Sequence, residues 1–278
     1  MRRCLVCGGE LTNSKLKGLV ECKDCGFITT DILLSEDEIK KLYSEGYYNG
    51  EEYDDYLRDE KMISRQFSKR LDTIDRLCSG IERVLEIGCA YGFFLREASK
   101  RYEYVQGIDV SETAVRYAKE ELGMNACCGD FYSEFSDTNF DLVCLWDTIE
   151  HLQNPDKYIE KIGNIQNKNG YICITTGDIG SMNAKIRGRK WRQIHPPTHL
   201  HYFSIKSISQ LLRNNGYEVI YKTHIPTVVN LQTAFYTILC IKSDHKKLWN
   251  ILSKLRVFNL NVGLKLFDYM FVIARKKI

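Results

Sequence analysis

Residues 82–101, ERVLEIGCAYGFFLREASKR, give the clearest indication of the class of fold. The stretch begins with a continuous apolar run, turns at Gly88 and Gly92, and continues with apolar residues at helical spacing. A continuous apolar run is typical of a strand that is buried on both faces, as in parallel sheets covered by helices. The stretch therefore predicts the first strand and the first helix of a parallel α/β sheet.

The same pattern recurs further along the chain. Apolar runs stand at residues 103–110, 124–130, 140–147 and 170–177, and helical patterns lie between them. Alternation of this kind predicts a doubly wound sheet with helices on both faces.

The turn after the first strand differs from that of dinucleotide-binding proteins. Their fingerprint, G-x-G-x-x-G, needs its second glycine so that the backbone can approach a pyrophosphate. Here Ala90 and Phe93 stand where the second and third glycines would be. The turn is therefore suited to a nucleoside and poorly suited to a pyrophosphate.

An acidic residue stands at the end of each of the first four predicted strands: Glu86, Asp109, Asp130 and Asp147. Ligands of open α/β sheets bind beyond the carboxyl ends of the strands, so these carboxylates should line one crevice. That arrangement suits a cationic ligand with ribose hydroxyls. Taken singly, each acid is equally typical of an ordinary helix cap.

Four segments carry a family resemblance. VLEIGCAYGFFL, GIDVSETAV, CCGDF and FDLVCLWDTIEHLQNP resemble, in order, the motifs of class I S-adenosylmethionine-dependent methyltransferases across about residues 81–221. The resemblance implies a Rossmann-like sheet of seven mostly parallel strands, with residues 267–278 as an antiparallel last strand. It also implies S-adenosylmethionine as the cofactor.

The resemblance further implies roles for individual residues. It places Glu86, Gly88 and Gly92 at the methionine part of the cofactor, Asp109 at the ribose hydroxyls, Asp130 and Phe131 at the adenine, and Trp146 and Asp147 at the sulfonium. Ala90 departs from the glycine that is commoner at its position.

The molecule that receives the methyl group, the acceptor, needs its own binding and catalytic residues. Three residues are candidates for this role: Asp147, His151 and His199. A hydroxyl acceptor must lose its proton, and an imidazole with a pKa of about 6.5 is a natural general base. His151 follows the fourth strand and fits that role. The alternative is that His151 begins the next helix and only makes supporting hydrogen bonds.

The segment QIHPPTHLHYFS, residues 193–204, contains His195, His199 and His201 within a long connection. Such connections are typical of lids and binding loops. WRQIHPPTHLHYFS resembles a loop of methyltransferases from surface-polysaccharide and modified-sugar pathways, which often also carry a four-cysteine ribbon and a segment like LYSEGYY, residues 42–48. This favours O- or C-methylation of a sugar nucleotide or glycan. The alternative use of these histidines is a metal site with Glu150 and His151.

Cys4, Cys7, Cys22 and Cys25 form two C-x2-C knuckles. A knuckle directs two thiolates toward one tetrahedral point, so the spacing predicts a closed zinc ribbon with structural Zn²⁺. The remaining cysteines stand mostly in apolar runs, which is typical of buried free thiols in a reducing compartment.

The predicted domain organisation has three parts. Residues 1–30 form the ribbon, residues 31–80 form a helical and aromatic linker, and residues 81–278 form the methyltransferase domain with a helical insertion at about 226–266. Within the linker, Ser35 and Glu38 predict a capping box. Apolar residues at helical spacing predict an amphipathic helix from Glu60 to Leu77.

Composition limits the classes of function. The chain has 278 residues, 44% hydrophobic and 27% charged, with a net charge of +3, which is typical of a globular protein and disfavours a nucleic-acid partner. An RNA methyltransferase and a non-catalytic cofactor-binding interaction protein remain the alternatives.

The residues contain neither a signal peptide pattern nor an apolar run of membrane-spanning length, so we expect a cytoplasmic protein. The basic and apolar segment 243–266 favours core or oligomer packing, with peripheral membrane contact as the alternative.

Overall fold

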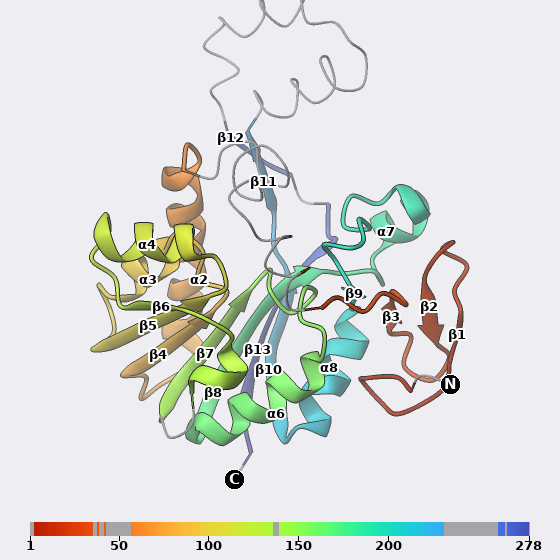
Figure 1. Ribbon diagram of the computed structural model, residues 1–278, viewed down its shortest axis with the longest axis horizontal. Helices are drawn as coiled ribbons and strands as arrows, with labels where there is room; N and C mark the ends of the chain where they lie inside the picture. Colours follow the sequence, from red (N-terminus) through yellow and green to blue (C-terminus); the bar gives the residue numbers. More distant parts are fainter. Residues whose placement is uncertain are drawn as a thin grey trace, which may run out of the picture.

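The computed structural model describes residues 3–35, 38, 42, 57–135, 139–230, 261–264 and 266–277. A seven-stranded sheet forms its centre, in the order β10-β13-β8-β7-β4-β5-β6 (Figure 1). In chain order the strands are β4 (Arg83–Ile87), β5 (Tyr104–Asp109), β6 (Ala126–Cys128), β7 (Phe140–Trp146), β8 (Gln166–Gly177), β10 (Tyr217–His224) and β13 (Tyr269–Lys276).

Strand directions confirm the predicted sheet. Neighbours from β6 through β5, β4 and β7 to β8 pair in parallel, whereas β13 runs antiparallel to both β8 and β10. The carboxyl ends of β4, β5, β6, β7 and β8 consequently meet at one edge of the sheet. We call this the carboxyl edge.

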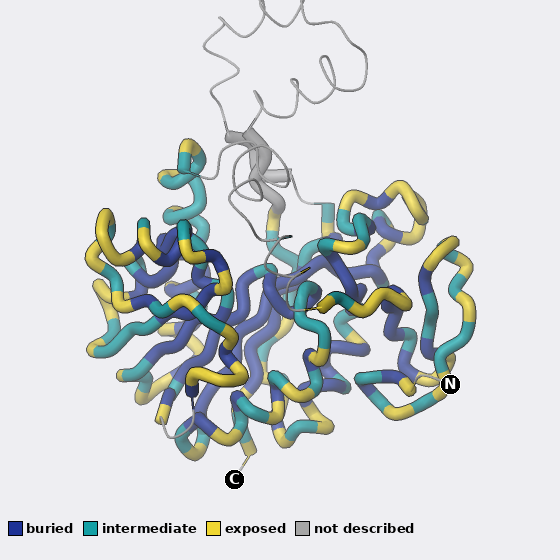
Figure 2. Tube along the Cα trace, in the orientation of Figure 1, coloured by how far each residue is buried: buried dark blue, intermediate teal, exposed yellow. Residues whose placement is uncertain are grey.

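Helices cover both faces of the sheet. α2, α3 and α4 bury their apolar sides on one face, and α6 and α8 on the other (Figures 1 and 2). The helices are α2 (Glu60–Leu77), α3 (Phe93–Ala98), α4 (Glu112–Glu120), α5 (Phe131–Glu134), α6 (Pro155–Ile165), α7 (Met182–Arg187) and α8 (Ile205–Asn214). α2 has the predicted bounds because Phe67, Leu71 and Ile74 form its buried stripe.

The N-terminal residues form a small second sheet with a strand from the long connection. Its order is β1 (Leu11–Asn13), β2 (Val20–Cys22), β3 (Ile28–Thr29) and β9 (His201–Tyr202), with β3 and β9 antiparallel. Val6, Phe27 and the buried cysteines also pack into the core cluster under α8. The cysteine segment is thus joined to the segment that carries the predicted acceptor histidines.

Two predicted segments lie partly outside the described residues. In the linker, the Ser35 hydroxyl and the Glu38 carboxylate make the predicted capping-box hydrogen bonds. Of the predicted insertion, the described ends form an antiparallel pair, β11 (Thr227–Asn230) and β12 (Asn261–Leu264), and residues 231–260 lie outside. The helical character of that insertion and the domain boundaries stay predictions.

Within the described part of the chain, no helix combines the length and the apolar character that crossing a membrane requires.

Candidate active site

The turn after β4 is held in a left-handed backbone conformation. Gly88 and Gly92 both have φ of +78°, and Ala90 between them has φ of +45°. The Gly88 and Cys89 amides donate to the Ile108 carbonyl oxygen, which fixes the turn against β5. The fold therefore uses Ala90 in a conformation that glycine adopts at lower cost.

Gly88 also has no room for a side chain. A Cβ atom there would lie 2.5 Å from the Thr148 hydroxyl oxygen. That hydroxyl donates to the Ile87 and Trp146 carbonyl oxygens, so it is fixed in place. Sequence reasoning missed Thr148, because its importance lies in a contact between two strand ends.

We expect Gly88→Ala to destabilise the protein more than Gly80→Ala. Gly80 also has a positive φ, +69°, but a Cβ there meets no described atom within 4 Å. Both variants lose about 1–2 kcal/mol to the left-handed backbone, and Gly88→Ala adds roughly 1–3 kcal/mol of overpacking. Urea unfolding measures the difference. Equal losses in the two variants would contradict the contact with Thr148.

Asp109 ends β5 directly beside this turn. Its side chain is buried, and its two carboxylate oxygens accept hydrogen bonds from the Ala90 amide, at 2.8 Å, and the Ser111 amide, at 2.9 Å. Burial raises the pKa of Asp109, although the amide hydrogen bonds oppose this shift. Each oxygen keeps a further lone pair, so the carboxylate can still accept hydrogen bonds from a ligand.

Glu86 and Trp146 lie at neighbouring strand ends with unsatisfied polar atoms. Among the described residues, neither Glu86 Oε2 nor Trp146 Nε1 has a hydrogen-bond partner. Burial and the nearby Asp109 raise the pKa of Glu86 well above its usual value, and the charge of Arg70 opposes this. Buried polar atoms without partners call for an explanation, and a ligand that reaches both strand ends supplies one.

Arg70 of α2 is a residue that sequence reasoning missed. Its guanidinium lies over the Trp146 ring, 5.1 Å from the ring centroid, and over the Phe67 ring at 5.2 Å. Its charge also opposes the rise that burial causes in the pKa of Asp147. The sequence does contain an indication of its role, because Arg70 is a charged residue among the apolar positions that form the buried stripe of α2.

Asp147 follows β7 with a strained backbone. Its φ is +54°, and its Oδ1 accepts a hydrogen bond from the Thr175 hydroxyl at 2.7 Å. Such strain in a non-glycine residue persists where surrounding contacts enforce it, and it concentrates at functional sites. The structure thus places Asp147 at the carboxyl edge in a position that local preference alone does not produce.

The residues predicted for adenine lie at the end of β6. Asp130 accepts a hydrogen bond from the Tyr158 hydroxyl, while Phe131 is buried against Phe135 and Tyr158. The Phe131 ring is therefore part of the core. A role for these two residues toward adenine stays a prediction.

The predicted acceptor residues His151 and His199 meet one another. Their ring centroids are 4.6 Å apart, and the His195 ring lies 3.9 Å from that of His199. Burial lowers the pKa of His151 to about 4 and that of His199 well below its usual value, so both are neutral near pH 7. Glu150 joins them, with side-chain ligand atoms of the three residues all within 4.8 Å of one another.

His201 serves a different purpose from His199. Its Nδ1 is 2.9 Å from the Thr29 hydroxyl of β3, and its Nε2 is 2.7 Å from the Leu152 carbonyl oxygen. It therefore links the N-terminal sheet to the segment after β7. The alternative in which His199 and His201 bind the same metal ion therefore does not hold for His201, because both of its ring nitrogens already make these hydrogen bonds.

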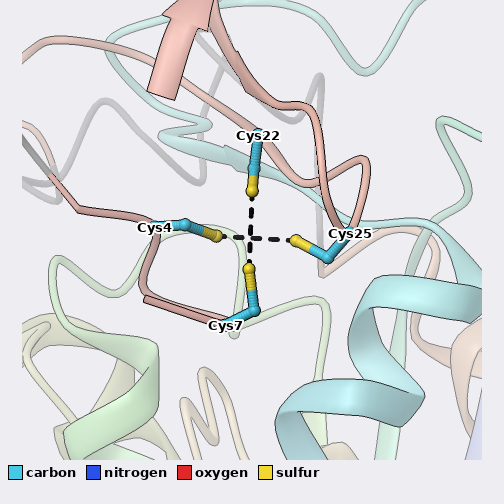
Figure 3. Close-up of side chains that lie close together, drawn as sticks. All are labelled: Cys4, Cys7, Cys22 and Cys25. Atoms are coloured by element: carbon cyan, nitrogen blue, oxygen red, sulfur yellow. Dashed lines mark hydrogen bonds between the residues drawn. The ribbon is translucent and has the colours of Figure 1, made fainter. Parts of the chain in front are cut away.

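The four N-terminal cysteines converge on one point (Figure 3). Cys4 Sγ lies 3.5 Å from Cys25 Sγ, and Cys7 Sγ lies 3.4 Å from Cys22 Sγ. Tetrahedral zinc with Zn–S bonds of about 2.3 Å separates its sulfurs by roughly 3.8 Å, so the four atoms fit such an ion closely. Burial raises the pKa of Cys4 to about 11, whereas hydrogen bonds from the Cys25 and Asp24 backbone lower the pKa of Cys22 despite its burial.

The doubly wound sheet, its left-handed turn and the carboxylates at its carboxyl edge define the class I methyltransferase fold. A family model described as a methyltransferase domain matches residues 55–222, more than half of the chain, and the chain belongs to that family. This places the glycine turn, Asp109 and Asp147 within the part of the chain that the family shares.

Individual relatives are distant. The ubiquinone biosynthesis O-methyltransferase of Azoarcus sp. (strain BH72) is 27% identical over 115 residues, 38% of this chain, and the match spans about half of that protein, 49%. A chain in the complex between the Haloferax volcanii Trm112 methyltransferase activator and a methyltransferase is 18% identical, with a TM-score of 0.57 over 88% of this chain and 100% of that one. An S-adenosylmethionine-dependent methyltransferase from Archaeoglobus fulgidus is 19% identical, with a TM-score of 0.54 over 80% and 99%. The solved structures share the fold.

Proposed function

We propose that this protein is an S-adenosylmethionine-dependent methyltransferase that methylates an oxygen or carbon of a sugar nucleotide or glycan. One observation carries the cofactor part of the proposal. The buried Asp109 carboxylate faces the left-handed turn at Gly88, Ala90 and Gly92, and it is held there by the Ala90 and Ser111 amides. This is a preformed acceptor of hydrogen bonds from a ribose.

The residues at the carboxyl edge fit the rest of that cofactor. The unpartnered Glu86 Oε2 would accept from its ammonium group, and Arg70 would balance negative charge around Glu86 and Asp147. When bound, the cofactor supplies a methyl group on a positively charged sulfur. Trp146 and Asp147 would lie beside that sulfur, where a buried site excludes water.

The acceptor side would be formed by Asp147, His151 and His199. Transfer of a methyl group is an in-line displacement, so alignment of the acceptor supplies much of the acceleration. Neutral His151 and His199 can hold a polar acceptor group by hydrogen bonds, while their lowered pKa values make both weaker bases than a free imidazole. The Leu200 and His201 amides donate to the Glu150 carbonyl oxygen, which fixes the segment 193–204 beside these residues.

The sugar part of the proposal rests on the resemblance of WRQIHPPTHLHYFS and LYSEGYY to segments of sugar-pathway methyltransferases. The proposed structural Zn²⁺ rests on the four converging cysteines and their sulfur geometry. In this arrangement the ribbon, residues 1–30, would hold β9 in place. It would thereby also hold residues 193–204, which we call the acceptor segment.

A labelled-methyl screen tests the proposed function. The full-length chain is incubated with methyl-labelled S-adenosylmethionine and separate panels of nucleotide-activated sugars, oligosaccharides and total RNA, with Asp109→Ala as the inactive control. We expect label in a sugar-containing product. Label in RNA alone would overturn the sugar acceptor and leave a methyltransferase. Cofactor binding without label in any panel would instead favour a non-catalytic protein.

A further inference from the structure

Glu150, His151 and His199 form a second group of metal-ligating side chains, separate from the cysteines. Glu150 and His151 follow β7, whereas His199 comes from the segment before β9. One side-chain ligand atom from each lies within 4.8 Å of the other two. A tetrahedral ion bound at about 2.1 Å separates its ligands by roughly 3.4 Å, so small side-chain rotations bring this group to a coordinating geometry.

The hydrogen bonds of the two histidines orient them as ligands. His151 Nδ1 lies 2.8 Å from the Thr198 carbonyl oxygen, and His199 Nδ1 lies 2.9 Å from the Gln193 carbonyl oxygen. A carbonyl oxygen only accepts, so in neutral His199 the Nδ1 carries the proton and the Nε2 carries a lone pair. The His151 ring also has a hydrogen-bond contact with the Asp147 backbone, which an ion bound to its Nε2 would replace. Metal-binding histidines are held in the same way, with the non-ligating ring nitrogen donating to a carbonyl or carboxylate.

Glu150 provides the second, independent observation. Its side chain is 2% exposed, and its Oε2 has no hydrogen-bond partner among the described residues. The carboxyl group also has hydrogen bonds with the Glu150 backbone and with the Thr176 side chain. A buried carboxylate oxygen without a partner is costly, and a bound cation removes that cost.

The ligand set selects the kind of ion. Two imidazoles and one carboxylate suit Zn²⁺ and related first-row dications, whereas Mg²⁺ and Ca²⁺ prefer oxygen ligands alone. Sites with three protein ligands keep a coordination position open, unlike the closed four-cysteine site. We propose that Glu150, His151 and His199 bind a Zn²⁺ ion with an open position at the carboxyl edge of the sheet.

The use of this ion rests on the proposed function. An acceptor hydroxyl bound at the open position would release its proton to water more readily, because the cation stabilises the alkoxide. The alkoxide oxygen would then form a bond to the methyl carbon as the carbon–sulfur bond breaks and its electron pair stays on sulfur. In that case His151 and His199 act through the metal, and neither is the general base.

Metal stoichiometry tests the site independently of any methyl acceptor. The full-length chain is saturated with Zn²⁺, freed of loosely bound metal and assayed by elemental analysis, in the unaltered form and as Glu150→Gln, His199→Gln and Cys4→Ser/Cys22→Ser variants. We expect about two equivalents in the unaltered chain, and loss of about one in each variant. His224→Gln, which changes a histidine outside the cluster, should keep both.

Cobalt distinguishes the two sites when a variant folds poorly. Co²⁺ bound to thiolates shows strong sulfur-to-metal charge-transfer absorption that a histidine and carboxylate site lacks. Titration of the unaltered, metal-free chain should therefore give one equivalent with that absorption and one without it. A single equivalent at saturation, or two equivalents that persist in folded Glu150→Gln and His199→Gln, overturns the proposed site. Cofactor affinity is measured separately, so its loss or retention bears on the proposed function alone.

Discussion

Asp109→Ala is expected to weaken S-adenosylmethionine binding by at least about 100-fold. Hydrogen bonds to a charged group are worth roughly 1.5–3 kcal/mol each, and two such bonds to a ribose exceed the roughly 2.7 kcal/mol that a hundredfold change requires. The substitution also removes the acceptors of the Ala90 and Ser111 amides, which hold the turn against β5. Isothermal titration calorimetry of the purified variants measures the dissociation constant.

Two controls separate binding from folding. Asp72→Ala changes an exposed acid on α2, with 66% of its side chain accessible, and should leave the dissociation constant unchanged. Asp109→Asn keeps an acceptor oxygen and should lose less affinity than Asp109→Ala, while circular dichroism confirms that each variant is folded. A dissociation constant within threefold of the unaltered protein in folded Asp109→Ala would show that the cofactor model is wrong.

The regular part of the fold could be predicted because its signals are local. The apolar runs mark strands that are buried on both faces, and the spacing of Phe67, Leu71 and Ile74 marks α2 with its observed bounds. The cysteine spacing likewise predicted that the four thiols meet at one point, and the structure places their sulfur atoms within 4.8 Å of one another. In each case the residues that make the feature stand close together in the sequence.

Contacts between distant segments could not be predicted. The pairing of Thr29 with His201 joins residues that are far apart in the chain, and a two-residue strand leaves almost no periodic signal. The three clustered histidines are a second example. They appear equivalent in the sequence, but the structure directs His199 toward His151 and His201 toward β3.

The second large effect is expected from Cys4→Ser/Cys22→Ser, which removes one thiolate from each knuckle. Metal ions in closed cysteine sites contribute directly to folding, by about 10–16 kcal/mol in isolated zinc-finger peptides, so the N-terminal sheet should unfold. Three of the four cysteines lie in the core cluster that also contains Phe27 and Phe203, and β3 pairs with β9. The loss should therefore spread to residues 193–204 and abolish methyl transfer.

The cofactor turn should survive this change, because Asp109 ends β5 and Gly88 follows β4 in the seven-stranded sheet, whereas β9 belongs to the small N-terminal sheet. The variant is thus expected to bind S-adenosylmethionine with a nearly unchanged dissociation constant while residues 193–204 become sensitive to limited proteolysis. Cys128→Ser, a change at an exposed thiol outside the cluster, is the matched control and should keep zinc, protease resistance and activity. If the double variant retained the protease resistance and activity of the control, the ribbon would have no part in holding the acceptor segment. Its role would then be limited to contacts made by the N-terminal residues themselves.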